Sequence, residues 1–409
     1  MSLLDRVLPP RMGLSFRWLF ASNLVGNIGD GIALAAGPLL VASQTHNAIL
    51  VALAGLLQRL PWLLFGLYAG ALADRLDRRV VVMVADAVRA LIIAALCVMI
   101  LTHAVNITVV LIVMFCFGIG EVFADSTSST LLPMLVDKAD LAIGSARMQA
   151  GNLAANQLVG PPVGAFLFAA GMAVPFVTQA VSVAFGVMLV SRIATPKGGV
   201  RGEAVTNVRR DVVDGLRFLW GHAAVRTLAV VIFVFNITWG AAWSVLVLYS
   251  LNRLHMGEVG FGLLTTATAV GGIAGTASFD WLQRRVALKT LMRGCLLLEV
   301  LTHLSLALTT VPWVAMVIMV VFGAYAFVWG TLGYTVRQRA VPTEFQGRVG
   351  SVYVVGLFAG LVIGQGLGGV IAEQWGLAAP FWFAFVGSGI TLVLVWRQLA
   401  HIAHADSGS

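Results

Sequence analysis

Long runs of apolar residues follow one another along almost the whole sequence, and they constrain the fold more than any other feature. A helix that crosses the hydrocarbon core of a bilayer needs about 20 apolar residues, because every backbone N–H and C=O must be satisfied within the segment. Only 11% of the 409 residues are charged, against roughly 25% in an average soluble domain. We therefore predict an all-α membrane protein. The runs number twelve and cover residues 17–43, 47–73, 80–103, 107–134, 141–170, 172–194, 225–251, 258–282, 286–309, 312–336, 347–373 and 376–398.

The basic residues follow the predicted connections between these runs. Of the 26 lysines and arginines, 23 lie at or beside the even-numbered connections and the two ends, and the odd-numbered connections contain only Arg253. Positively charged side chains stay preferentially on the cytoplasmic side of a membrane. We therefore expect a multi-pass protein of the cell (cytoplasmic) membrane with both termini in the cytoplasm. The net charge of +8 then reflects topology, and nucleic acid is not an expected partner.

The second half of the sequence repeats landmarks of the first at a constant offset of 206 residues. LDRRV at 76–80 returns as LQRRV at 282–286, and Gly-Ser at 144–145 returns at 350–351. Six helices per copy with the same orientation predict two parallel halves, related by an axis along the membrane normal. The expected organisation is an N-terminal half at 1–194, a cytoplasmic amphipathic linker at 195–224, a C-terminal half at 225–398 and a cytoplasmic tail at 399–409.

Short motifs of the common enzyme classes are missing from the sequence. It has no Gly-Lys-Ser/Thr phosphate loop, no His-Glu-x-x-His metal site and no Gly-x-Ser-x-Gly elbow, so neither an enzyme nor an ATP-driven pump is expected. Cys97, Cys116 and Cys295 lie in separate apolar runs without metal-ligand spacing, and we expect free thiols, no metal and no cofactor. Two alternatives stay open: catalysis by scattered intramembrane residues, and a non-transporting receptor or scaffold.

The segment from Gly70 to Arg79 reads GALADRLDRR and lies in the connection after the second run. Together with the rest of residues 14–100, it resembles the multidrug and siderophore exporter branch of the major facilitator superfamily, which includes macrolide-efflux proteins and the enterobactin exporter. Asp77 stands where that superfamily usually has glycine. The resemblance implies the major facilitator fold, with twelve transmembrane helices in two parallel six-helix halves, and drug export in exchange for protons.

In this superfamily the same loop holds the cytoplasmic side closed, and the resemblance implies a gate made of Gly70, Asp74, Arg75 and Arg78. Asp74 and Arg78 are four residues apart, so a carboxylate on this face can meet the positive N-terminal end of a helix from the other half. Asp125, in the fourth run, is the expected counter-ion of Arg78. The alternative is an ordinary solvated charge cluster that only fixes the topology.

The fifth run contains NQLVGPPVG at 156–164, which resembles the antiporter signature of the superfamily. Gly160 and Gly164 allow a facing helix to approach closely, while Pro161 and Pro162 remove two backbone donors and bend the span. The resemblance implies that these four residues seal the outer part of the interface between the halves against leak. Simple helix packing is the alternative.

Ionisable side chains in the middle of a span are costly, and this makes them candidate functional groups. Asp30 lies near the predicted midplane on one helical face with Asn23 and Asn27, and Arg59 of the next run lies at a depth that allows it to pair with Asp30. Glu121 is also near the midplane, and a carboxyl group buried without a partner is favoured in its neutral form. We predict Glu121 as the first candidate for the proton site and Asp30 as the second.

Two further pairs of polar residues lie within the runs. Asp86 and Arg89 in the third run are predicted closer to the cytoplasmic surface than the transport site, and we assign them to the gate. Glu299 and His303 in the ninth run are four residues apart at mid-depth. They form either a second protonatable pair or a structural contact, and we favour the structural contact.

Aromatic residues at helical spacing distinguish the second half of the sequence. Aromatic faces with few polar groups suit flat, lipophilic and often cationic compounds, although such stripes also serve helix packing and interfacial belts. The predicted substrate-binding residues are Asn23, Asn27, Asp30, Phe117 and Glu121 in the first half, and Asn236, Trp239, Trp243, Tyr325 and Trp329 in the second.

These features predict a secondary active exporter, a proton antiporter of small amphipathic or lipophilic compounds, with multidrug efflux as the main expectation. A siderophore or a lysophospholipid is the alternative substrate, because the same apolar cavity would admit either. The expected partners are a small-molecule substrate, protons and the lipid bilayer, and the protein is expected to be monomeric.

Overall fold

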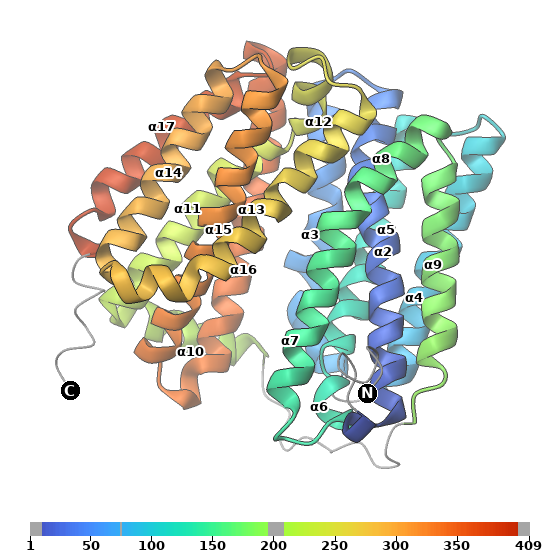
Figure 1. Cartoon of the computed structure of the whole chain (residues 1–409), viewed down its shortest axis with the longest axis horizontal. Helices are drawn as coiled ribbons and strands as arrows, with labels where there is room; N and C mark the ends of the chain where they lie inside the picture. Colours follow the sequence, from blue (N-terminus) through green and yellow to red (C-terminus); the bar gives the residue numbers. More distant parts are fainter. Residues whose placement is uncertain (1–9, 74–75, 195–207, 400–409) are drawn as a thin grey trace. The chain divides into compact units, whose positions relative to one another are not determined.

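The computed structural model describes residues 10–73, 76–194 and 208–399, and this part of the chain folds into helices without any strand (Figure 1). Within these ranges, ten helices are long and apolar enough to cross a membrane. Two further apolar helices, α9 (Val174–Val190) and α17 (Ala379–Val395), have 17 residues each. The predicted all-α membrane fold is confirmed, and the helices found are consistent with the twelve expected spans.

The chain divides into two compact units. Unit 1 comprises Met1–Thr45, Leu57–Ala204 and Glu258–Gly262, and unit 2 comprises the remaining residues. Two helices, α3 (Ala48–Ala73) and α13 (Glu258–Arg285), contribute residues to both units.

Unit 1 is built around its first long helix. The other helices of this unit are α4 (Arg78–Leu101), α5 (Ile107–Ser128), the short α6 (Leu132–Leu135), α7 (Leu141–Asn152), α8 (Gly160–Ala170) and α9. α2 (Gly13–Gln44) packs between α8 and α9, and α4 packs against α5 and α9 (Figure 1).

Glycines bring the backbones of α2 and α8 into direct contact. A β-carbon at Gly160 would overlap the backbone of Gly31, and a β-carbon at Gly164 would overlap the carbonyl of Ile32. Gly160 and Gly164 carry no side chain at these points, so α8 approaches α2 more closely than larger residues would allow.

The predicted span at 141–170 is three segments in the structure. A π-helical turn, Leu153–Val159, separates α7 from α8. It ends directly before Gly160, Pro161 and Pro162, where the two prolines supply no N–H to the preceding carbonyls. π-helical turns of this kind widen a helix locally and occur frequently at functional sites.

Asp77 has a structural role at the start of α4. Its carboxylate accepts hydrogen bonds from the backbone N–H groups of Arg79 and Val80, at 3.0 and 3.4 Å. These N–H groups have no partner within the helix, and aspartate is among the preferred N-cap residues. The departure from the usual glycine therefore supplies a helix cap.

Unit 2 has a separate apolar core, which includes Val231 and Phe235 of α11 and Met292 and Leu296 of α14. α11 packs against α16 and α17, and α14 packs against α15 and α17. The elements of this unit are α10 (Val208–Gly221), α11 (Ala223–Trp243), the short α12 (Leu246–Leu248), a π-helical turn (Tyr249–Arg253), most of α13, α14 (Leu288–Leu308), α15 (Pro312–Ala340), α16 (Thr343–Trp375) and α17.

The amphipathic helix expected before the second half is present as α10. It packs against α16 and α11. A β-carbon at Gly215 would lie 2.6 Å from the carbonyl oxygen of Arg348, so the two helices are in close contact. An ion pair of 3.9 Å between Asp214 and Arg348 joins the same helices.

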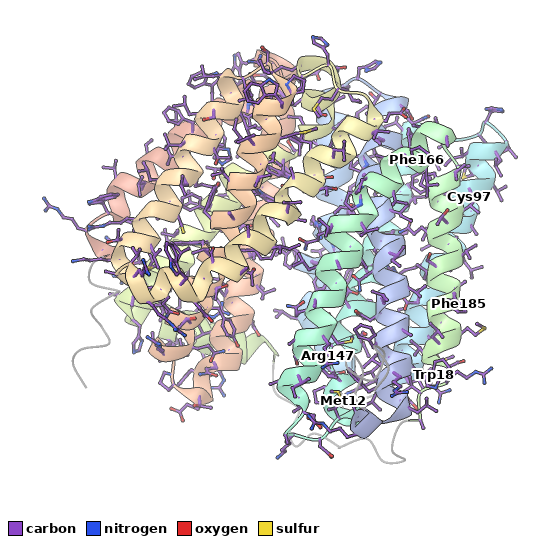
Figure 2. The ribbon with its side chains drawn as sticks, viewed as in Figure 1. Met12, Trp18, Cys97, Arg147, Phe166 and Phe185 are labelled. Carbon is purple, nitrogen blue, oxygen red and sulfur yellow. The ribbon has the colours of Figure 1, made fainter. Side chains whose placement is uncertain are left out.

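Large apolar side chains cover the outside of the bundle. Phe166 on α8 and Phe185 on α9 are 64% and 44% exposed (Figure 2). Exposed phenylalanines are costly in water and suited to lipid. The protein is therefore a multi-pass membrane protein.

Candidate functional site

A polar cavity of about 620 Å³ lies within unit 1. Its walls come from α2, α3, α4, α5, α6, α7 and the π-helical turn. The cavity brings together all five residues of the first half that the sequence predicts as substrate-binding: Asn23, Asn27, Asp30, Phe117 and Glu121.

A buried arginine joins two carboxylates at one wall of this cavity. Arg89 Nη2 donates to Asp30 Oδ1 at 2.7 Å, and Arg89 Nη1 donates to Asp86 Oδ1 at 2.8 Å. The Arg89 side chain is only 4% exposed, and its guanidinium lies 4.6 Å from the centroid of the Phe117 ring. Gln179, which is also buried, donates to Asp30 Oδ1 at 3.4 Å.

Two expectations are corrected by this arrangement. Asp30 pairs with Arg89 and not with Arg59, and Asp86 and Arg89 lie in the same cavity as the predicted proton sites rather than at a separate gate. The physical reason is local space beside α4. A β-carbon at Gly120 would lie 2.5 Å from Arg89 Cγ, so the glycine gives the arginine stem a path to Asp30.

Glu121 has a weaker partner than Asp30. Its Oε1 lies 4.0 Å from Arg59 Nη1, and its Oε2 is buried without a hydrogen-bond partner among the described residues. Glu121 is therefore an incompletely satisfied carboxyl group inside a membrane protein.

Asp125 lies one turn further along α5 and faces the same cavity. Its side chain is exposed, and within the described part of the chain it forms no ion pair with Arg78. Arg78 instead donates to the carbonyl of Thr130 at 3.3 Å. The predicted Asp125–Arg78 contact is thus absent from the structure, because the side chain of Asp125 faces the cavity with Glu121.

The charges that line the cavity do not balance. Among the described residues, its ionisable side chains are the four carboxylates of Asp30, Asp86, Glu121 and Asp125, against the two guanidiniums of Arg59 and Arg89. If every group is ionised, the cavity carries a formal excess of two negative charges. Such an excess within an apolar bundle attracts protons or cationic molecules.

Amides complete the wall of the cavity. Asn27 Nδ2 donates to the carbonyl of Asn23 at 2.8 Å, and Asn152 Nδ2 donates to Asn27 Oδ1 at 2.7 Å. Sequence reasoning missed most of the polar residues here, although a signal existed: polar side chains recur at Asn152, Asn156 and Gln157 within an apolar run. The other polar residues that it missed as cavity-lining include Gln58, Asp86, Arg89, Ser145 and Gln149.

The predicted gate is described only in part. Asp74 and Arg75 lie outside the described residues. Gly70 lies near the end of α3, where an added β-carbon would meet no atom within 4 Å. Arg79, next to the gate residue Arg78, donates to the carbonyl of Ser191, which follows α9.

The predicted seal residues all lie at the start of α8. Gly160, Pro161 and Gly164 are buried, and Pro162 is partly buried. The two glycines face α2 within unit 1, as described above, so helix packing is one role that they have in this structure.

A second, smaller cavity of about 120 Å³ lies within unit 2. It brings together four of the five predicted binding residues of the second half: Asn236, Trp239, Tyr325 and Trp329. The fifth, Trp243, does not line this cavity but stacks on Trp239, with ring centroids 5.0 Å apart. Glu299, for which the sequence favours a structural contact, also lines this cavity.

Comparison with known proteins identifies the family. Residues 7–406 match the family model described as "Transmembrane secretion effector". The chain is 30% identical over 379 residues to the multidrug efflux pump Tap of Mycolicibacterium fortuitum, covering 89% of this chain and 90% of that protein. It is 24% identical to the enterobactin exporter EntS of Salmonella typhi, covering 94% and 93%.

The fold comparison agrees with the sequence comparison. A crystal structure of a bacterial homologue of the iron transporter ferroportin superposes with a TM-score of 0.76 at 17% identity, covering 98% of this chain and 99% of that one. The resemblance seen in the segment from Gly70 to Arg79 is therefore confirmed over nearly the whole chain. The chain belongs to the transmembrane secretion effector family of the major facilitator superfamily.

Proposed function

We propose that this protein is a secondary active exporter that exchanges protons for small amphipathic or lipophilic compounds, and that multidrug efflux is its main activity. The observation that carries the proposal is the excess of carboxylates over guanidiniums in the cavity of unit 1. When a proton leaves such a cavity, a carboxylate becomes free to neutralise one positive charge on a substrate. This exchange couples proton movement to substrate movement. The similarity to a multidrug efflux pump supports the direction of transport.

The carboxylates of the cavity have different roles in this proposal, because their contacts differ. Asp30 is held by the buried guanidinium of Arg89 at 2.7 Å. Glu121 lies 4.0 Å from Arg59 and has one unsatisfied oxygen. Glu121 is therefore the first choice for the group that binds and releases the transported proton, and Asp30 provides fixed negative charge.

The charge distribution and the family support the following organisation of the transporter. Both termini lie in the cytoplasm, and the protein works as a monomer in the cytoplasmic membrane, with halves at 1–194 and 225–398 joined by 195–224. Arg78, with Gly70, Asp74 and Arg75, closes the cytoplasmic side. The helix contact at Gly160, Pro161, Pro162 and Gly164 closes the outer side.

Transport into proteoliposomes tests the proposal. The purified protein is reconstituted into vesicles with an acidic lumen, and the fluorescent cation ethidium is added outside. We expect ethidium to accumulate as protons leave, and the accumulation to collapse when an ionophore dissipates the pH gradient. The control is the same vesicle with equal pH on both sides. Uptake no faster than in protein-free vesicles, with every substrate offered, would instead support a receptor or scaffold.

Siderophore export is the second candidate, and the similarity to the enterobactin exporter favours it. A catecholate siderophore is acidic, however, and the carboxylate excess of the cavity disfavours an anion. The same vesicles distinguish the two functions when a catecholate or a lysophospholipid replaces ethidium. Transport of the catecholate without transport of ethidium would support this second candidate.

A further inference from the structure

Glu299 of α14 is an ionisable residue that the proposed transport cycle does not use. It is 7% exposed and lies inside unit 2. Its Oε2 accepts a hydrogen bond from the hydroxyl of Tyr325 at 2.7 Å, and its Oε1 lies 3.0 Å from His303 Nε2. Thr302 Oγ1 lies 3.2 Å from the same tyrosine hydroxyl. A cluster of this kind is expensive inside a membrane protein unless its net charge is small.

The net charge of the Glu299–His303 pair depends on one proton. With one proton shared between Glu299 and His303, the pair is neutral, either as two uncharged groups or as a carboxylate beside an imidazolium. Without that proton, the pair carries one buried negative charge. No arginine or lysine forms an ion pair with Glu299 in the described part of the chain. The deprotonated cluster therefore needs a cation from outside the protein.

The surrounding groups supply no such cation. On α14 itself, the ionisable neighbours of Glu299 are His303 and Cys295, and on α15 the facing group is Tyr325. α17 contains no ionisable side chain, and Arg226 near the beginning of α11 is the only one on that helix. His303 is completely buried, and its Nδ1 has no hydrogen-bond partner among the described residues.

The cavity beside Glu299 has the walls of a cation site. Trp239, Phe322, Tyr325 and Trp329 line it together with Glu299. Trp243 holds two of these rings in place, with its centroid 5.0 Å from that of Trp239 and 4.9 Å from that of Phe322. Aromatic faces around a quaternary ammonium group attract it through their electron-rich rings, and a carboxylate at the wall adds a full charge.

The volume of the cavity and one unsatisfied hydrogen-bond donor further restrict the kind of ligand that it can hold. A volume of about 120 Å³ is smaller than the roughly 300–1,000 Å³ of sites that hold a whole drug-sized molecule. It suits the charged head of such a molecule. The indole N–H of Trp239, at the wall of the cavity, has no hydrogen-bond partner among the described residues, and it is a donor for a polar atom close to that head.

We propose that the cavity of unit 2 binds the quaternary ammonium or protonated amine head of a lipophilic cation, with Glu299 as its counter-ion, and that the cation displaces the one proton held between Glu299 and His303. The inference rests on the proposed function only in assuming that the occupant is a transported compound. The proton leaves to solvent as the cation enters, so charge balances and no covalent bond changes other than the one to that proton.

Binding of choline to the purified protein in detergent tests the exchange. Choline is the probe because it is a small quaternary ammonium ion, and 3,3-dimethyl-1-butanol is its uncharged isostere. Calorimetry is carried out between about pH 5 and pH 8, the range in which histidine titrates. If one proton is released for each choline bound, the dissociation constant falls about tenfold for each unit by which the pH is raised, as long as the pair without choline remains protonated. Binding of the isostere is expected to be independent of pH.

Variants assign the effect to this cavity. Glu299→Gln is expected to weaken choline binding by about tenfold or more and to abolish its pH dependence, since a neutral amide holds no exchangeable proton. Binding of the isostere should survive and shows that the cavity is still folded. Trp329→Leu should weaken choline binding and keep the pH slope. Glu344→Gln, at an exposed carboxylate of α16, is the matched control and should change neither.

Two results would overturn the inference: choline affinity that does not vary with pH, or a Glu299→Gln protein that binds choline as the unmodified protein does. Its failure is distinct from failure of the proposed function, because the assay measures binding without transport. Normal pH-dependent choline binding in a protein that moves no ethidium would remove the export proposal and support this site. Coupled ethidium export by Glu299→Gln, with choline binding also unchanged, would support the export proposal and remove the proposed cation site.

Discussion

Arg89 Nη2 lies 2.7 Å from Asp30 Oδ1, and this contact joins α4 to α2 within unit 1. The second nitrogen of the same guanidinium holds Asp86 at 2.8 Å. One buried cation therefore neutralises two carboxylates that come from different helices. The arrangement sets the charge of the cavity, because among its described lining residues it leaves only Arg59 as a further cation beside Glu121 and Asp125.

Replacing Arg89 by glutamine should destabilise the protein strongly. Removing one partner of a buried ion pair costs about 3–5 kcal/mol, because it leaves uncompensated charge. We expect a large drop in the melting temperature of Arg89→Gln in detergent. The double variant Asp30→Asn/Arg89→Gln should lose less than the sum of the two single variants, by about 0.5–3 kcal/mol.

The pair of Arg11 and Asp140, at 2.7 Å, is the matched control, because its arginine is exposed. Arg11 is 64% exposed, and exposed pairs contribute about 0–1 kcal/mol. Arg11→Gln should therefore melt close to the unmodified protein. Additive losses in the Asp30 and Arg89 cycle would mean that the two residues do not interact in the membrane protein as the structure places them.

Gly120 should tolerate no side chain. A β-carbon there would lie 2.5 Å from Arg89 Cγ, so Gly120→Ala must push the arginine stem away from its path to Asp30. We expect a loss of thermal stability and a loss of proton-coupled transport in the same variant. Gly294→Ala on α14 is the control, because an added β-carbon there meets no atom within 4 Å. Equal behaviour of the two variants would show that Arg89 does not depend on the space beside Gly120.

The start of α8 gives a prediction about packing and leak. Gly160→Leu places a branched side chain against the backbone of Gly31, and the two helices must separate to accommodate it. We expect the variant to insert into the membrane but to export no substrate. Gly356→Ala on α16, where nothing lies within 4 Å of the added atom, should export normally. Full export by Gly160→Leu would exclude a role for this helix contact in the seal.

The positions of the helices and of the intramembrane carboxylates could be predicted from the sequence, because they depend on local composition and on distance along a helix. Asp30 and Glu121 lie in one cavity as predicted. The partner of Asp30 could not be predicted in the same way. Position along a helix predicts which groups lie at the same depth in the membrane. The choice between Arg59 and Arg89 also depends on helix rotation and on the space beside Gly120.

The π-helical turn at Leu153–Val159 is another feature that the apolar pattern did not show. The two prolines predicted a bend, but not the widened turn that precedes them or the amides that it places at the cavity. The same holds for Glu299, whose spacing with His303 was visible. Its contact with Tyr325, 26 residues away on another helix, depends on tertiary packing.

The last prediction concerns coupling between protons and substrate. Only a carboxyl group that gains and loses a proton during the cycle can drive export, and Glu121 is the one with a distant partner and an unsatisfied oxygen. Glu121→Gln keeps the shape of the side chain and fixes it in the neutral state. We expect this variant to exchange labelled ethidium down its gradient between vesicle lumen and medium, but not to accumulate it in response to a pH gradient.

Asp125→Asn is the matched comparison, because Asp125 lies one turn away on the same helix and faces the same cavity. If Glu121 alone carries the proton, Asp125→Asn should change the rate of transport while each ethidium ion still moves against a proton. Substrate-dependent proton flux, recorded with a pH-sensitive dye in the lumen, separates the two variants. Full coupling in Glu121→Gln together with uncoupling in Asp125→Asn would transfer the proton site to Asp125. Full coupling in both would leave Asp30, despite its contact with Arg89, as the remaining predicted proton site.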